Sequence, residues 1–376
     1  MQQAANIAGH RRLVVKVGSA LLAGADGRLN RAWLESLLDD VAALRRDGRQ
    51  VLIVSSGAVA LGCRALGLER GKARLDEQQA AAAAGQVRLA HAYLDMLEAR
   101  GLACAQILLT PDDTERRLRF LNARATLEKL LELGVVPVIN ENDTVATDEL
   151  RYGDNDRLAA RVAQLVMADG LVLLSDVDGL YSADPRLDGT ARHVPEVASL
   201  DADTLAMAGE SSSSYGSGGM RTKLAAARIA SRAGCETWIA RGRVQHPLAA
   251  LIDGARSTRI RAAGTPAAAR KQWLAGLLTV DSAVGVDAGA ATALRSGSSL
   301  LAVGVRRIDG EFERGDVVTL LDADGRELGR GIAGYSSADL EKIAGRRSED
   351  IEARLGYRGR AVVVHRDDMV LFATDG

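Results

Sequence analysis

Short apolar runs alternate with longer amphipathic segments along the chain as far as residue 240. The runs have the length of buried strands and occupy residues 13–17, 51–54, 104–109, 135–139, 171–176 and 235–240. Between them, apolar residues recur at helical spacing, which predicts helices near residues 30–47, 58–66, 76–100, 120–133, 156–167 and 220–233. Such alternation predicts an α/β fold in which helices sandwich a mainly parallel sheet.

The pattern changes near residue 262, where Arg, Ala, Gly and Pro replace the periodic segments. Beyond it, short strands separated by glycine turns are expected at residues 278–280, 300–305, 317–321, 329–333 and 361–364. We therefore expect a first domain at residues 1–262, a linker at 263–276 and a small β-rich, barrel-like domain at 277–376.

Composition indicates an ordinary globular protein, with 47% hydrophobic and 26% charged residues. The formal net charge of -1 argues against a dominant nucleic-acid or membrane-surface function, since these usually need a basic excess. Residues 277–376 hold 13 Lys and Arg against 17 Asp and Glu, a net charge of -4. This balance argues against RNA as a partner of the C-terminal domain, because phosphate neutralisation dominates such binding.

Neither cysteine nor histidine spacing predicts a metal site. Cys63, Cys104 and Cys235 are widely separated and match no zinc or disulfide pattern, so they are expected to be buried free thiols in a reducing compartment. The five histidines have no second ligand at metal-binding spacing. The N-terminal residues lack an apolar signal segment and no stretch approaches the length of a membrane span, so a cytoplasmic location is expected.

A glycine-rich segment, YGSGGMRTK at residues 215–223, comes directly before a predicted helix. Glycine lets backbone N–H groups approach an anion, and the helix N-terminus together with Lys223 adds positive charge. The combination indicates a phosphate-binding corner, although a plain connection would have similar composition. The spacing is not that of a Walker A motif.

Polar residues also stand at the ends of two other predicted strands. Lys16 interrupts the apolar run 13–17, and an unpaired buried ammonium group is costly, so the strand either lies at an edge or presents Lys16 to a ligand. Ser55, Ser56 and Gly57 follow the run 51–54, where open α/β sheets bind ligands. Helix capping is the alternative role for these residues.

The densest polar cluster follows the run 135–139 and contains NENDT at residues 140–144, DE at 148–149 and GDND at 153–156. It is longer than a simple connection needs. Its amides and carboxylates can receive the ammonium group of an amino acid or hold water around Mg²⁺; a solvated loop is the alternative.

Two lysines, a glycine corner and an amide and carboxylate loop are the parts that phosphoryl transfer requires. No Ser–His–Asp or Cys–His pattern stands out. The lack of an obvious general base indicates an acceptor that is already anionic, such as a carboxylate with a pKa of about 4.3.

Five ordered motifs closely resemble the glutamate 5-kinases of the amino acid kinase family: VVKVGS at residues 14–19, VSSGA at 54–58, VINEND at 138–143, YGDND at 152–156 and GSGGMRTK at 216–223. The C-terminal part, with RSGSSLL at 295–301 and VHRDDM at 364–369, looks like the PUA domain of bacterial members. The resemblance covers essentially the whole chain.

The resemblance implies ATP-dependent phosphorylation of the γ-carboxylate of L-glutamate to L-glutamate 5-phosphate, the first step of proline biosynthesis, with ATP and Mg²⁺. It implies that Lys16 and Lys223 stabilise the transferring phosphoryl group and that Asp156 orients them. The implied glutamate contacts are Ser56, Asp143, Asp154 and Asn155. The implied ATP contacts are Lys16, Ser175, Asp176, Ser217, Gly218, Gly219, Met220, Arg221, Thr222 and Lys223. Ser175 and Ser217 replace the threonine common in the family but keep its hydroxyl group.

The resemblance also implies a homo-oligomer and proline as a candidate feedback inhibitor. Alternatives are another kinase of this fold, acting on carbamate, aspartate or a nucleoside monophosphate, or an RNA-binding factor that works through the C-terminal domain. Lys223 is treated as an isolated loop lysine, so its replacement is expected to leave the fold intact.

Overall fold

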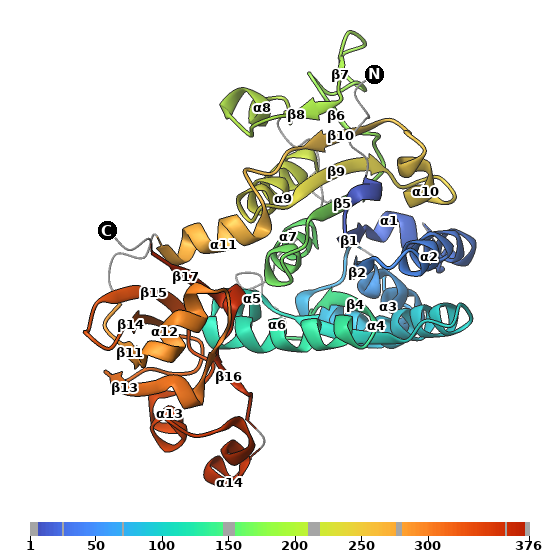
Figure 1. Ribbon diagram of the computed structural model, residues 1–376. Helices are drawn as coiled ribbons and strands as arrows, with labels where there is room; N and C mark the ends of the chain where they lie inside the picture. Colours follow the sequence, from blue (N-terminus) through green and yellow to red (C-terminus); the bar gives the residue numbers. More distant parts are fainter. Residues whose placement is uncertain are drawn as a thin grey trace. The chain divides into compact units, whose positions relative to one another are not determined.

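The computed structural model describes residues 7–24, 26–69, 71–145, 155–209, 219–275, 280–357 and 359–372 (Figure 1). The chain divides into two compact units, Met1–Pro266 and Ala267–Gly376. No helix among these described residues has the length and apolar character needed to span a bilayer.

The first unit is built on an eight-stranded sheet with the order β3-β4-β2-β1-β5-β9-β10-β8. Its strands are β1 (Arg12–Val17), β2 (Gln50–Ser55), β3 (Cys104–Leu109), β4 (Val136–Glu141), β5 (Gly170–Ser175), β8 (Glu196–Val197), β9 (Glu236–Arg241) and β10 (Ser257–Ile260). Every neighbouring pair is parallel except β9 and β10. The predicted mainly parallel sheet is therefore confirmed.

Helices cover both faces of this sheet, as Figure 1 shows. The first core contains side chains of α1 (Ser19–Leu22), α2 (Arg31–Arg46), α3 (Ala58–Leu66), α4 (Leu75–Glu98) and α10 (Pro247–Ile252). The opposite core contains side chains of α6 (Arg117–Glu132), α7 (Asn155–Leu165) and α9 (Met220–Arg232). Shorter elements are α5 (Pro111–Glu115), α8 (Ala202–Ala206) and a hairpin of β6 (Leu180–Tyr181) and β7 (His193–Val194).

Strand β1 lies in the interior of the sheet, paired with β2 on one side and β5 on the other. The interpretation of β1 as an edge strand is therefore wrong. Val15 and Val17 join the core with α2 and α4, whereas Val14 joins the core with α7 and α9. Because side chains alternate along a strand, Lys16 faces the α7 and α9 side of the sheet.

Helices α3 and α4 approach each other closely through two glycines. A Cβ atom added at Gly62 would lie 1.7 Å from the carbonyl oxygen of Ala81, and one at Gly85 would lie 1.8 Å from that of Ala58. Any side chain at these positions would collide with backbone atoms. The two glycines therefore fix the position of α4 against α3.

The second unit contains a five-stranded sheet with the order β13-β11-β14-β15-β17 and a separate β12-β16 pair. Its strands are β11 (Ala283–Val286), β12 (Leu300–Leu301), β13 (Val305–Asp309), β14 (Val317–Leu321), β15 (Glu327–Ile332), β16 (Val362–Val364) and β17 (Met369–Leu371). Its helices are α11 (Pro266–Ala275), α12 (Ala288–Arg295), α13 (Ser337–Ile343) and α14 (Ile351–Leu355). Neighbouring strands are antiparallel except β11 and β14.

One sequence-based expectation needs correction in this unit. The single strand expected at residues 300–305 is instead β12, a 3₁₀ turn at Ala302–Gly304 and the start of β13. The segment expected as a linker is largely the helix α11. The strand expected at 278–280 falls mostly outside the described residues, and Val280 is not in a strand.

Candidate active site

The carboxyl ends of four parallel strands carry the polar residues singled out in the sequence. Lys16 is the second-to-last residue of β1, and Asn140 is the second-to-last residue of β4. Ser56 directly follows β2, and Ser175 is the last residue of β5. Parallel strands bring these ends to one edge of the sheet, where α/β proteins bind their ligands. The helix α7 starts at the same edge with Asn155.

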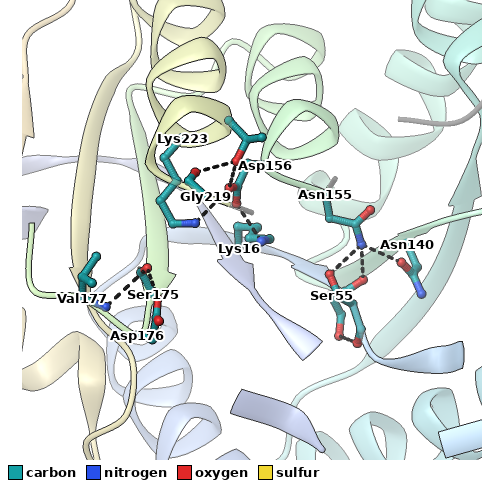
Figure 2. A network of polar contacts seen from close by, with 12 residues as sticks. Lys16, Ser55, Asn140, Asn155, Asp156, Ser175, Asp176, Val177, Gly219 and Lys223 are labelled. Carbon is teal, nitrogen blue, oxygen red and sulfur yellow. Dashed lines mark hydrogen bonds and ion pairs between the residues drawn. The ribbon is translucent and has the colours of Figure 1, made fainter. Parts of the chain in front are cut away.

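A buried charged trio consists of Lys16, Asp156 and Lys223 (Figure 2). Lys16 Nζ lies 2.7 Å from Asp156 Oδ1, and Lys223 Nζ lies 3.2 Å from Asp156 Oδ2. The side chain of Asp156 is fully buried and those of the lysines are only 7% and 5% exposed. Three segments that are distant in the sequence thus place two ammonium groups around one carboxylate.

The two lysines keep Asp156 ionised. Burial by itself raises the pKa of Asp156, but the charges of Lys16 and Lys223 outweigh burial and hold that pKa below its ordinary value. Thr222 Oγ1 also lies 3.3 Å from Asp156 Oδ2, and it donates to the carbonyl oxygen of Gly219 at 2.7 Å. With one carboxylate between two ammonium groups, the trio as a whole carries one positive charge.

Lys223 belongs to a helix and not to a loop. Gly219 is the N-cap residue of α9, so Lys223 lies within the first turn, where its side chain is buried. Treating it as an isolated loop lysine is therefore wrong. Because removing one partner of a buried ion pair is destabilising, replacement of Lys223 is expected to affect stability as well as chemistry.

A second set of contacts, the amide network, joins Gln86, Asn140, Asn155 and Ser56. Figure 2 shows the contacts of Asn155 with Asn140 and Ser55 beside the trio. Asn155 Nδ2 lies 2.9 Å from each of three acceptors: Asn140 Oδ1, Ser56 Oγ and the carbonyl oxygen of Ser55. Asn140 Nδ2 in turn donates to Gln86 Oε1 at 2.8 Å. The network holds the Asn155 side chain from three directions.

Tyr93 supports this network from the opposite core. Its side chain is fully buried, and its hydroxyl group lies 3.0 Å from Ser55 Oγ. Burial raises the pKa of Tyr93 far above its ordinary value, so its hydroxyl group stays protonated. Ser55 Oγ also donates to the carbonyl oxygen of Ser56 at 3.2 Å, which fixes the turn after β2.

The serines after β2 do not cap the helix that follows. The N-cap residue of α3 is Gly57, which has a φ of 102° and makes no side-chain capping bond. Glycine is favoured there because other residues rarely adopt this conformation. The capping alternative is therefore correct for Gly57 but wrong for Ser55 and Ser56, which contact the amide network instead.

The described residues predicted to contact ATP lie at the same edge of the sheet, but most of them make no hydrogen bond to the charged trio. Ser175 Oγ donates to Asp176 Oδ1 at 3.1 Å, and Asp176 is exposed. Among the described residues, no hydrogen bond in the structure joins this pair to the charged trio. Met220 is half-buried against the α6, α7 and α9 core, whereas Arg221 is exposed.

The remaining predicted site residues lie either beside the site or outside the described residues. Asp143 is half-buried just after β4, and the buried position of Asn140 contradicts a fully solvated loop in the part that is described. Asp154, Ser217 and Gly218 lie outside the described residues. All three cysteines are free, as predicted; Cys63 and Cys235 are also buried as predicted, whereas Cys104 is only half-buried. The part of the chain that the structure describes contains no cluster of His, Cys, Asp and Glu suited to hold a metal by itself.

Two residues that no sequence motif marks, Gln86 and Tyr93, also contact the predicted site residues. Both belong to α4, for which the sequence predicted only a helix near residues 76–100. The available signal was weak: Gln86 follows Gly85, where a helix can approach another backbone closely, and it is a polar residue after a run of alanines.

Comparisons with known proteins show the family to which the chain belongs. The model of the amino acid kinase family matches residues 11–241, and that of the PUA domain matches residues 282–355. The chain is 54% identical to a glutamate 5-kinase of Sinorhizobium fredii over 367 residues, which cover 98% of this chain and 93% of that protein.

Two further relatives are similar to this chain over nearly their full lengths. A glutamate 5-kinase of Paramagnetospirillum magneticum is 55% identical, covering 97% of this chain and 99% of the relative. One of Caulobacter vibrioides is 56% identical, covering 96% of each. The chain therefore belongs to the amino acid kinase family and carries a PUA domain in its C-terminal unit.

Proposed function

We propose that this protein transfers the γ-phosphoryl group of ATP to the γ-carboxylate of L-glutamate, giving L-glutamate 5-phosphate and ADP, as the first step of proline biosynthesis. The observation that carries this proposal is the buried charged trio beside a neutral amide network at one edge of the sheet. The names of relatives that match nearly the whole chain support the same reaction.

The charged trio is suited to the migrating phosphoryl group. Negative charge develops on the phosphoryl oxygens during transfer, and fixed cations in a water-poor site stabilise it strongly. Lys16 and Lys223 supply those cations, and Asp156 sets the separation between them. The trio is catalytic in this proposal because its two ammonium groups contact the reacting phosphate.

The acceptor needs no general base. A glutamate γ-carboxylate is ionised at neutral pH, so its oxygen attacks the γ-phosphorus directly while the bond from that phosphorus to the ADP oxygen breaks. The products are an acyl phosphate and ADP, and no proton has to be removed from the acceptor. This agrees with the lack of an obvious base among the proposed site residues.

The nucleotide binds on the side of β5 and α9 in this proposal. Ser175, Asp176, Ser217, Gly218 and the segment Gly219–Lys223 contact ATP, whose phosphates meet the N-terminus of α9. Mg²⁺ accompanies the nucleotide and neutralises phosphate charge; it usually keeps several waters and binds one or two carboxylates together with phosphate oxygens. Asp176, exposed after β5, is suited to contribute one such carboxylate.

Glutamate binds on the other side of the trio, at Ser56, Asp143, Asp154 and Asn155. The described members offer hydroxyl, carboxylate and amide groups next to the charged trio, as recognition of an amino acid requires. Homo-oligomer formation, inhibition by proline and a cytoplasmic location remain predictions from the sequence.

Release of ADP with different acceptors tests the proposal. The purified full-length chain with Mg²⁺ and ATP is expected to turn over L-glutamate, with hydroxylamine trapping the acyl phosphate as a hydroxamate. Aspartate, carbamate and a nucleoside monophosphate are the comparison acceptors, and each is assayed with and without proline. Faster turnover of any of these three acceptors than of glutamate would overturn the assignment.

A further inference from the structure

We propose that Gln86 on α4 is a positioning residue that orients Asn155, so that the carbonyl oxygen of Asn155 receives the α-ammonium group of glutamate. This inference rests on the proposed function, because it assumes glutamate as the acceptor. It assigns a role to Gln86, which lies outside the five motifs that resemble the glutamate 5-kinases.

Two backbone groups fix the direction of every hydrogen bond in the amide network. The carbonyl oxygen of Ser55 can only accept, so the end of the Asn155 amide that lies 2.9 Å from it must be the NH₂ group. The backbone N–H of Glu141 can only donate, so the end of the Asn140 amide that lies 2.9 Å from it must be the oxygen.

These two anchors determine what Gln86 has to present. With its oxygen held by Glu141 and Asn155, Asn140 turns its NH₂ group toward α4, where Gln86 Oε1 accepts at 2.8 Å. An acceptor at position 86 therefore holds Asn140 in the orientation that also accepts from Asn155. Without that acceptor, the NH₂ group of Asn140 loses its partner and the amide is no longer held in one orientation.

The same contacts decide which end of Asn155 is available to a substrate. Its NH₂ group has two hydrogens and three acceptors within 2.9 Å, so its donor capacity is used inside the protein. Its Oδ1 points away from these contacts, as Figure 2 shows. Among the described residues, none donates a hydrogen bond to this oxygen.

The chemistry of glutamate then selects one contact. Both carboxylates of glutamate only accept hydrogen bonds, and its ammonium group is its strong donor. A carbonyl oxygen repels a carboxylate and binds an ammonium group, so Asn155 Oδ1 is suited to the α-ammonium. If the Asn155 amide were rotated by 180°, its NH₂ group would face the substrate and would favour a carboxylate instead. Gln86 opposes this rotation because it holds Asn140 with its oxygen toward the NH₂ group of Asn155.

Gln86 is held firmly enough for this role. It directly follows Gly85, whose backbone contacts the carbonyl of Ala58 so closely that no side chain fits. Its side chain is half-buried, and Tyr93, two turns later on the same helix, contacts Ser55. Helix α4 therefore supports both ends of the network.

Three variants of the full-length chain test the inference. Gln86→Met keeps the length of the side chain but removes the acceptor. Gln86→Glu keeps an acceptor for Asn140 Nδ2. Gln78→Met is the matched control, because Gln78 lies on the same helix, its side chain donates to the carbonyl oxygen of Ala73 at 2.8 Å, and it makes no hydrogen bond to the amide network among the described residues.

For Gln86→Met we expect the KM for glutamate to rise about tenfold, the effect of one lost hydrogen bond that orients a charged contact. The KM for ATP should stay at the wild-type value, and the melting temperature should fall by a few degrees at most, because the buried NH₂ group of Asn140 loses one hydrogen bond. Gln86→Glu should restore the glutamate KM, and Gln78→Met should not change it. Glutarate, which lacks the ammonium group, should inhibit Gln86→Met and the wild type equally as a competitor of glutamate.

Several results would overturn the inference. They are an unchanged glutamate KM in Gln86→Met, an equal rise of the ATP KM, a defect in Gln86→Glu as large as that in Gln86→Met, or glutarate inhibition that weakens in parallel. A wild-type chain that releases no ADP with glutamate would instead contradict the proposed function, and this measurement comes before any variant is compared.

Discussion

The charged trio and the amide network begin at the same end of α7 but use opposite chemistry. Asp156 enters the trio and is fully buried between two lysines. Asn155, the preceding residue, enters the network and is half-buried among neutral groups. Successive residues of a helix point about 100° apart, so one helix start can serve two sides of a site.

The difference between the two regions teaches how the site divides its tasks. An ion pair is strong but tolerant of direction, which suits a phosphoryl group whose charge is spread over several oxygens. An amide has one donor end and one acceptor end, which suits recognition of an amino acid with a fixed arrangement of groups. Changes in the trio should therefore lower kcat, and changes in the network should raise the KM for glutamate.

Replacing Asp156 by Asn should have the largest effect. The variant leaves two buried ammonium groups without the carboxylate that separates them, so we expect a loss of about 3–5 kcal/mol in the free energy of unfolding, together with loss of activity. Urea denaturation of the two proteins measures this. A variant as stable as the wild type would show that Asp156 does not hold the lysines.

The difference in unfolding free energy between the wild type and Asp156→Asn should also depend on pH. The pKa of Asp156 is lower in the folded protein than its ordinary value of 3.8, so its stabilising contribution is present above pH 3.8 and is lost as the pH falls through the lower folded value. The difference in unfolding free energy between wild type and Asp156→Asn should be constant from about pH 8 to pH 5 and shrink only in stronger acid.

Replacing Lys223 by Met should lower kcat by about 10²–10³-fold, the usual effect of removing one group that stabilises developing charge. The KM for glutamate should change much less, since Lys223 lies in the trio and not in the amide network. ADP release under saturating substrates measures this. Lys72→Met, at an exposed lysine that pairs with Glu69, is the control. Near-normal turnover by Lys223→Met would remove Lys223 from the chemistry.

Local features of the fold could be predicted well from the sequence. The helix predicted near residues 30–47 begins after Asn30, a residue type that favours the N-cap position, and the Asn30 side chain accepts from the backbone N–H of Trp33 at the start of α2. The helix expected at residues 58–66 is α3 with the same bounds. Capping residues, glycine stops and apolar spacing act within a few positions, so the sequence displays them directly.

Features that depend on distant residues could not be predicted in this way. Lys16 looks unfavourable in an interior strand because its partner, Asp156, belongs to a helix far along the chain. Gln86 and Tyr93 look like ordinary residues of an alanine-rich helix until the strand order brings β2 and β4 beside α4. In the second unit, β12 and β17 are too short to show an apolar period of their own.

Replacing Gly85 by Ala tests whether the amide network depends on the position of α4. The new methyl group would lie 1.8 Å from the carbonyl oxygen of Ala58, so we expect a loss of about 1–3 kcal/mol in stability and a higher KM for glutamate. Gly289→Ala, in α12, is the control because its nearest neighbour is Asp287 Oδ1 at 3.4 Å. A Gly85→Ala variant with wild-type melting temperature and KM would show that α4 can shift without consequence.

Replacing Tyr93 by Phe should have the smallest effect, since it removes one hydroxyl group and preserves the ring in the core. Ser55 Oγ would lose the contact with Tyr93 but keep the carbonyl oxygen of Ser56, so the expected loss of stability is about 1 kcal/mol. Ser55 also supplies the carbonyl oxygen that accepts from Asn155, so the glutamate KM should rise, but less than in Gln86→Met. Thermal unfolding and steady-state kinetics measure both quantities. If kcat falls while the glutamate KM stays constant, Tyr93 would act on the charged trio, and the separation of tasks between the two regions would fail.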